Sequence, residues 1–438
     1  MKYLLLGLFF CASQLSALPE LDAAIAGKDQ GKAIEIYATR DLNETELDQL
    51  LQFIAGEKEK YRKKLSYAIR DRKATDAVAG RHLHNELLRL IKDNLVEDDT
   101  DYTEALLLAS GTNKNPDLIY SIAPFLVHPR LELRQEANRA VALKKDERIY
   151  PLIGQLLAGE NVIDKVYAME TLLALKDERA VPLLLLQLSN QSKNVRYFAL
   201  KTLEAIGSDK AQYGVINLAQ GDADEEVRLK AVEILRQFKT GPVFYALQKL
   251  IADPQLIIRT RALESALAQL DKKYANSISE QLARETDMTQ KHALLRGLLT
   301  LGSGGGMNGI LTLLKKESDA DLLLWSAFAC NRFSDSRCAD LFAQLLGSRS
   351  EQSIVLEAVV GLAQHKQRKH LPVLFTLAQD ATKPQVLRSA ALTAIQQYDN
   401  EAAIAPLFNL YESEQDQLIR VQARTLMTDL MKKKLPKL

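Results

Sequence analysis

The chain has 438 residues, of which 47% are hydrophobic, 26% charged and 6% aromatic. This apolar content excludes a disordered chain, and the small numbers of glycine, proline and aromatic residues favour helices over sheets. Its 57 basic and 56 acidic residues leave no basic excess to neutralise the phosphates of a nucleic acid. We therefore expect an all-α protein that does not bind nucleic acid.

The start of the chain is typical of an export signal. Lys2 is followed by an apolar run from Leu4 to Cys11 and by small residues that end at Ala17. We predict a signal peptide over residues 1–17, cleavage near Ala17, and a periplasmic or secreted protein without a transmembrane segment. The alternatives are a buried N-terminal helix and lipidation at Cys11, but the residues before Cys11 are not the small ones that a lipidation site has.

Residues 18–102 have helical spacing but no regular repeat. Segments such as ELDQLLQFIAGEKEKYRKKLSYAIRD and HNELLRLIKDNL fit helices of an irregular cap that covers the open end of a stack. The acidic stretch EDDTD, residues 97–101, is expected to separate this cap from the rest of the chain. A separate small domain is the alternative interpretation.

Residues 103–438 repeat themselves. The segment KDERIYPLIGQLL begins at Lys145, and the similar segment KDERAVPLLLLQL begins at Lys176. A short helical pattern recurs along the chain at nearly the same offset, which is the mark of a stacked repeat. We call the equivalent position of each copy its anchor. The anchors are Arg134, Lys165, Arg196, Arg228, Arg259, Lys291, Leu323, Val355, Arg388 and Arg420.

Each copy is predicted to form a helix, a turn and a second helix. In the copy of Arg196, Val195, Ala199, Leu203 and Ile206 recur at spacings of three and four, which place them on one face of a helix. A single hairpin cannot bury this face, so adjacent copies must stack. The predicted fold is an α-α superhelix, an α-solenoid of about ten to eleven helical hairpins with the irregular N-terminal cap.

The repeat pattern also resembles a known family. An apolar residue and arginine, alanine three positions later, leucine seven positions later, a polar turn and a Pro-Leu-rich helix resemble the HEAT repeat in its phycobilisome-lyase-type form, an armadillo-like solenoid. The resemblance covers about residues 103–435, and the copies at Lys291 and Leu323 depart most from the pattern. It implies that the anchor helices line the concave surface of the stack.

One group of apolar residues is predicted to face outward. The positions one and five residues after each anchor point away from the core, and five such or adjacent residues gather on two neighbouring copies: Leu324, Trp325, Phe328, Leu356 and Val360. Trp325 is the only tryptophan of the chain, and aromatic residues concentrate the binding energy of interfaces. We predict a surface that binds a protein or peptide. The alternative is that this irregular region rotates its helix and buries the same side chains.

Cys330 and Cys338 are the two cysteines that remain if the signal is removed. Their spacing allows a disulfide that closes a small loop in an oxidising compartment. The alternative is a pair of small buried residues, one on each helix of a repeat.

No motif predicts catalysis, a metal site or a cofactor. His82 and Glu86 share a helix face but have no further ligands nearby in the sequence, so we expect a solvated face. The HEAT-like iron enzymes that modify lysine carry His-Glu dipeptides, which this sequence lacks. The run Gly302–Gly309 lacks the ending of a phosphate loop and is predicted to be a flexible turn. We expect an exported, non-catalytic scaffold; the alternative is a lyase-like enzyme or ligand chaperone with a small-molecule pocket.

Overall fold

The computed structural model describes residues 18–433 except 56–58, 94–95 and 97–98. The predicted signal peptide, residues 1–17, lies outside the described residues. Every regular element in the described ranges is a helix, which confirms the all-α prediction. The chain divides into two compact units, residues 1–214 and 215–438, which we call the N-terminal and C-terminal units and describe separately.

The N-terminal unit consists of short helices joined by tight turns. They are α1 (Pro19–Ala26), α2 (Gln30–Thr39), α3 (Glu44–Ala55), α4 (Glu59–Arg72), α5 (Ala77–Lys92), α6 (Thr100–Thr112), α7 (Leu118–Ile122), η1 (Ala123–Val127), α8 (Leu131–Lys144), α9 (Ile149–Ala158), α10 (Val162–Leu175), η2 (Glu178–Ala180), α11 (Val181–Gln187), α12 (Lys193–Ile206) and η3 (Asp209–Ala211). Helix α13 (Gln212–Gly221) crosses the boundary between the units.

The C-terminal unit continues with helices of similar length. They are α14 (Glu225–Ile234), η4 (Leu235–Gln237), α15 (Gly241–Leu250), α16 (Leu256–Ala268), η5 (Lys272–Tyr274), α17 (Ala275–Arg284), α18 (Met288–Leu301), η6 (Gly304–Gly306), α19 (Met307–Lys316), α20 (Ala320–Phe333), α21 (Cys338–Ser348), α22 (Gln352–His365), η7 (Arg368–His370), α23 (Leu371–Gln379), α24 (Gln385–Tyr398), η8 (Glu401–Ala403), α25 (Ile404–Ser413) and α26 (Gln417–Lys432).

Alternate helices pack on one another in the N-terminal unit. Helices α2, α4, α6 and α8 contact in series, and so do α1, α3, α5 and α7. The pattern continues from α8 through α10 to α12. The helices of residues 18–102 thus pack in the same order as the later ones, and the boundary predicted between residues 102 and 103 falls inside α6.

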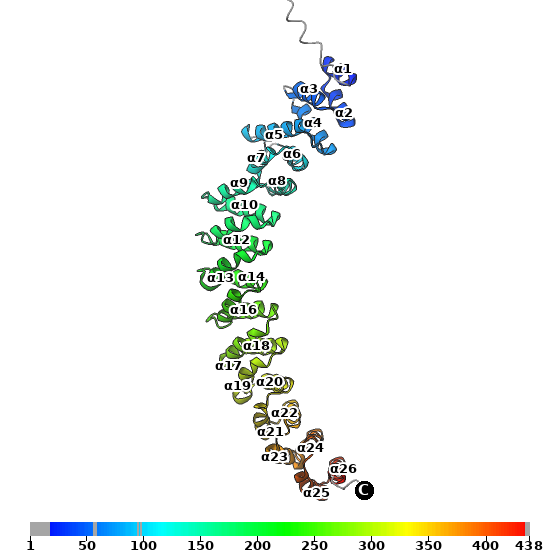
Figure 1. The fold of residues 1–438 in the computed structure, drawn as a ribbon, viewed down its shortest axis with the longest axis vertical. Coiled ribbons are helices and arrows are strands. Elements are labelled where there is room, and N and C mark those ends of the chain that lie inside the picture. The colour runs from blue at the N-terminus through cyan, green and yellow to red at the C-terminus, as the bar shows by residue number, and fades with distance from the viewer. Residues whose placement is uncertain (1–17, 56–58, 94–95, 97–98, 434–438) are drawn as a thin grey trace, which may run out of the picture. The chain divides into compact units, whose positions relative to one another are not determined.

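The C-terminal unit has the same two layers. Helices α14, α16, α18, α20, α22, α24 and α26 contact in series and form what we call the even layer. Helices α17, α19, α21 and α23 contact in series in the opposite layer, and Figure 1 shows the two sets on opposite sides of this unit. This arrangement is the predicted α-solenoid of stacked hairpins.

The predicted anchors have one structural register. Each is the fourth residue of its helix, from Arg134 in α8 to Arg420 in α26. The copies at Lys291 and Leu323, which depart most from the sequence pattern, keep this register in α18 and α20, both 14 residues long. A lysine or leucine anchor is therefore compatible with the same helix start as an arginine anchor.

The anchor arginines bind the turn that precedes their helix. Arg134 donates hydrogen bonds to the carbonyls of residues 128 and 129, and Arg259 donates to those of residues 253 and 254. Carbonyls near a helix end lack partners within the helix, and the guanidinium supplies them. In some copies the anchor also pairs with the glutamate that directly follows the second helix of the hairpin, as in Arg259–Glu285, Lys291–Glu317 and Arg388–Glu414.

The core of each copy follows the predicted stripe. The alanines three residues after the first anchors are at most 1% exposed, which allows close approach of neighbouring helices. The predicted core leucines Leu172, Leu203 and Leu235 are 0% exposed.

Part of the glycine-rich run is closely packed: an added Cβ atom would meet a neighbour at Gly306 and Gly309 but not at Gly302 or Gly304. Gly302 ends α18 with a φ of 61°, a conformation that favours glycine. The amide of Gly309, inside α19, donates a 2.7 Å hydrogen bond to the Ser279 hydroxyl of α17. A Cβ atom on Gly309 would lie 2.4 Å from the Ser279 carbonyl oxygen. The glycines therefore allow two helices of one layer to approach, which the sequence pattern did not indicate.

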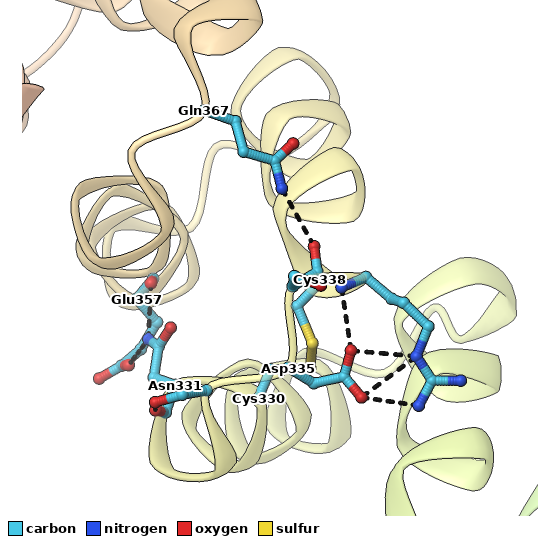
Figure 2. The surroundings of a disulfide bond; sticks show 9 residues. Cys330, Asn331, Asp335, Cys338, Glu357 and Gln367 are labelled. Carbon is cyan, nitrogen blue, oxygen red and sulfur yellow. Dashed lines mark hydrogen bonds and ion pairs between the residues drawn. A yellow bond between two sulfur atoms is a disulfide. The ribbon is translucent and has the colours of Figure 1, made fainter.

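Cys330 and Cys338 form a disulfide between α20 and α21 (Figure 2). Both cysteines are 0% exposed, and their Cα atoms lie 6.2 Å apart. On the other side of α20, Asn331 donates hydrogen bonds of 2.8 Å to the carbonyl and carboxylate oxygens of Glu357 in α22 (Figure 2). The C-terminal end of α20 is thus fixed to both the following helix and the next copy.

Replacing both cysteines by alanine is expected to lower the free energy of unfolding by about 2.5 kcal/mol, because the bond closes a loop of about nine residues in the unfolded chain. Urea denaturation of the oxidised protein, the reduced protein and the double variant measures this loss. Reductant should not change the double variant. Equal stability of all three proteins would contradict the prediction.

Candidate functional site

The five predicted binding residues lie on one exposed area of the even layer. Trp325 and Phe328 of α20 are 50% and 39% exposed, and Val360 of α22 is 54% exposed. Leu324 and Leu356 are half-buried beside them. The alternative that α20 rotates and buries these side chains is therefore wrong. We call these five residues the docking surface.

The register of α20 explains why its aromatic residues face outward. Leu322, Leu323, Ser326 and Ala327 are fully buried and hold one side of the helix against its neighbours. Trp325 and Phe328, three residues apart, therefore share the opposite side, and their rings meet edge to face with centroids 5.8 Å apart. Each ring limits the freedom of the other, so the pair is a preorganised apolar surface.

A cavity of about 270 Å³ lies next to Trp325. It is lined by Trp325 and by four residues of α18: His292, Leu295, Arg296 and Leu299. Of these residues, Leu295 is buried and Arg296 is exposed.

A second cavity, of about 520 Å³, lies between α16 and α18. His292 and Arg296 line both cavities, so the two lie side by side along the even layer. Leu256, Leu263 and Glu264 of α16 are among its other lining residues. We call the two cavities together the groove.

The groove contains one cation that makes no ion pair with a described residue. Glu264 pairs with Arg261 at 3.2 Å, and Asp319 lies 4.0 Å from the His292 ring. The guanidinium of Arg296 has no hydrogen bond or ion pair with any described side chain. His292 and Arg296 hold outward positions in the sequence pattern, where polar residues are ordinary, so the sequence alone does not indicate that they belong to the site.

His82 and Glu86 do not form the solvated face that we predicted. Glu86 of α5 is 5% exposed, accepts a 2.9 Å hydrogen bond from the Tyr102 hydroxyl and pairs with Arg89 at 3.0 Å. The Ser66 hydroxyl lies 3.0 Å from both the His82 Nε2 atom and the Tyr102 hydroxyl. Ser66 is fully buried, and the network joins α4, α5 and α6 as a structural element.

The free energy of unfolding is expected to fall as the pH is lowered from about 6.5 to about 4, because of His82. Burial lowers the pKa of His82 from 6.5 to about 4. In this window the unfolded chain binds a proton that the folded chain does not, so the loss reaches up to about 1.4 kcal/mol per pH unit. Urea denaturation of a His82→Gln variant should show a weaker pH dependence than the wild type. The control variant His292→Gln should keep the pH dependence of the wild type. Equal pH dependence of the His82→Gln variant and the wild type would contradict this assignment.

The C-terminal part of the chain matches a known family. The family model of HEAT repeats covers residues 339–427, from α21 into α26. The chain contains HEAT repeats. This agrees with the resemblance found in the sequence pattern.

Several solved HEAT-like structures are similar to this chain. The complex of CpcE and CpcF of phycocyanin lyase from Nostoc is 15% identical, with a TM-score of 0.29 over 57% of this chain and 94% of that one. Human deoxyhypusine hydroxylase is 18% identical, with a TM-score of 0.26 over 65% and 97%. The karyopherin Kap121p is 11% identical, with a TM-score of 0.46 over 93% and 49%. No curated protein matches the sequence. Similarity this low says nothing about function.

Two further findings concern the described part of the chain. None of its helices is long and apolar enough to cross a bilayer. Nor do three or more of its His, Cys, Asp or Glu side chains lie together as a metal ion would require.

Proposed function

We propose that the protein is an exported, non-catalytic HEAT-repeat scaffold that binds a segment of a protein partner through the docking surface. By resemblance to HEAT-like stacks, the even layer lines the concave side. The proposal includes no nucleic-acid partner, because basic and acidic residues are balanced.

One observation carries this proposal: Trp325, Phe328 and Val360 are exposed together on two neighbouring helices, beside the groove. Large apolar side chains that are held rigidly at the surface lose little entropy on binding and gain much from desolvation. Interfaces obtain most of their affinity from such clusters.

The proposed export is supported by the composition of residues 1–17 and by the disulfide of Cys330 and Cys338. Disulfides persist in oxidising compartments. Mass spectrometry of the protein purified from its native cells is expected to find a chain that begins near residue 18. A chain that keeps Met1 or begins elsewhere would contradict cleavage near Ala17.

Binding is tested by comparing matched variants of the full chain. Photo-crosslinking from position 324 in native cells identifies the partner, and calorimetry measures its affinity for the purified protein. The double variant Trp325→Ala/Phe328→Ala is expected to bind at least about 2 kcal/mol more weakly, roughly 30-fold, because it removes the aromatic pair.

The control variant removes two exposed aromatic residues from helices outside the even layer. Tyr245 of α15 and Phe408 of α25 are 70% and 49% exposed, so Tyr245→Ala/Phe408→Ala matches the loss of apolar surface. It should bind as the wild type does. Equal affinity of the wild type and the Trp325→Ala/Phe328→Ala variant would contradict the proposal, as would a small molecule bound stoichiometrically at Trp325.

A further inference from the structure

We infer that the groove selects a partner segment that carries an acidic side chain about three residues from a large apolar side chain. This inference rests on the proposed function and narrows it to a class of peptide. It follows from the charges in the groove, the size of its smaller cavity and the spacing of its helices.

Arg296 gives the groove a local binding site for a carboxylate. The two acidic residues that line the groove already have partners: Glu264 pairs with Arg261, and Asp287 accepts the 2.8 Å hydrogen bond of the Gln290 amide at the start of α18. Arg296 is exposed and makes no ion pair with a described residue. A guanidinium binds a carboxylate through two parallel hydrogen bonds, so a partner carboxylate complements Arg296.

The smaller cavity favours one apolar side chain. Its volume of about 270 Å³ lies below the range of about 300–1,000 Å³ that is typical of small-molecule pockets. Leu295, Leu299 and Trp325 line it with apolar surface, and its two polar lining residues, His292 and Arg296, are not buried. A single aromatic or aliphatic side chain fits this environment.

The register of the repeats sets the distance between these two groups. Arg296 and Phe328 are each the ninth residue of their helices, and α18 and α20 pack directly against each other. Packed helices lie roughly 8–10 Å apart, and an extended chain advances about 3.3 Å per residue. A segment that crosses the layer therefore places an apolar residue near Trp325 and Phe328 about three residues from an acidic residue at Arg296.

The groove continues on both sides of Arg296. The larger cavity extends from His292 and Arg296 toward α16, and the docking surface extends past Phe328 to Val360 of α22. A bound chain therefore passes over Arg296 and does not end there. The carboxylate is that of an aspartate or glutamate side chain within the segment.

The test uses synthetic peptides with acetylated and amidated ends, which carry no terminal charge. Each contains one phenylalanine and one glutamate, in either order, separated by zero to five glycine or serine residues. Binding to the full chain is followed by the fluorescence of Trp325, the only tryptophan. We expect the highest affinity when the glutamate lies about three positions from the phenylalanine, and at least a tenfold loss when glutamine replaces it.

Charge reversal supplies the second arm. The Arg296→Glu variant should bind the glutamate peptide at least tenfold more weakly than the wild type does. It should prefer the peptide in which lysine replaces the glutamate. Arg424→Glu removes another exposed arginine of the even layer, on α26, and should behave as the wild type. A peptide with a free C-terminal carboxylate but no glutamate should bind no better than its amide.

The outcomes separate this inference from the proposed function. Equal binding of glutamate and glutamine peptides, an unchanged preference in Arg296→Glu, or no binding of any peptide overturns the inference. The proposed function is judged independently, by the loss of partner affinity in Trp325→Ala/Phe328→Ala.

Discussion

Replacing Arg259 by alanine is expected to lower the free energy of unfolding by about 3–5 kcal/mol, because it leaves the buried carboxylate of Glu285 without its cation. The Arg259 guanidinium donates hydrogen bonds of 3.0 and 3.1 Å to the two oxygens of Glu285. The side chains of Arg259 and Glu285 are 13% and 2% exposed. Urea denaturation followed by circular dichroism measures the change.

The size of this effect comes from the number of segments that the pair joins. Arg259 lies in α16 and donates hydrogen bonds to the carbonyls of residues 253 and 254, in the turn before this helix. It also pairs with Glu285, which directly follows α17. Glu285 also accepts hydrogen bonds from Gln281 and from the amides of residues 286 and 287. Removing the arginine therefore leaves backbone carbonyls and a buried charge uncompensated at once.

The same pair makes stability depend on pH. Burial opposes the charged form of Glu285, but hydrogen bonds from Gln281, Arg259 and nearby amides outweigh it and hold its pKa below the ordinary value. A lowered carboxyl pKa gives stability above the pKa of the unfolded chain, and this stability is lost as pH falls through the folded pKa. The Arg259→Ala variant should lose less stability on acidification than the wild type.

Two controls distinguish the pair from general effects of losing an arginine. Arg261→Ala breaks the pair with Glu264, whose side chains are 43% and 58% exposed, and should cost less than about 1 kcal/mol. The double variant Arg259→Met/Glu285→Met removes both charges and should recover the part of the loss that comes from the unpaired carboxylate. A cost for Arg259→Ala no larger than that for Arg261→Ala would contradict the assignment.

The sequence predicted the repeats well because their evidence is local and recurs in every copy. A residue such as Ala199 or Leu203 returns at the same helical position in copy after copy, and stacking then follows from the need to bury that face. The role of the anchor arginine was not predicted, although its position was. Its partners lie in the turn before its own helix and at the end of the next helix, and no spacing rule for a single helix connects them.

The docking surface was predicted in part for a similar reason. Trp325 and Phe328 were identified because apolar residues are unexpected at outward positions. Arg296 is ordinary at such a position, and only the cavity that it shares with Trp325 gives it significance. The hydrogen-bond network of His82 is not predictable from the sequence, because Ser66 and Tyr102 come from other helices, α4 and α6, which the spacing within α5 does not reveal.

Replacing Leu203 by alanine is expected to cost about 2–5 kcal/mol, the largest effect we predict for an apolar substitution. Leu203 is 0% exposed in α12, which packs against both α10 and α11. The variant loses the transfer free energy of the side chain and leaves a cavity that the packed helices fill only in part. Urea denaturation measures the loss.

The stacked architecture is tested by which helices are destabilised in Leu203→Ala, in addition to how much stability is lost. In a stack each copy is stabilised by its neighbours, so hydrogen exchange should accelerate in α10, α11 and α12 more than in α1 to α5. Leu186→Ala is the matched control, because this leucine of α11 is 72% exposed, and it should change stability by less than about 0.5 kcal/mol. Uniform acceleration across residues 19–206 would show that these helices unfold as one cooperative core and not as neighbouring copies.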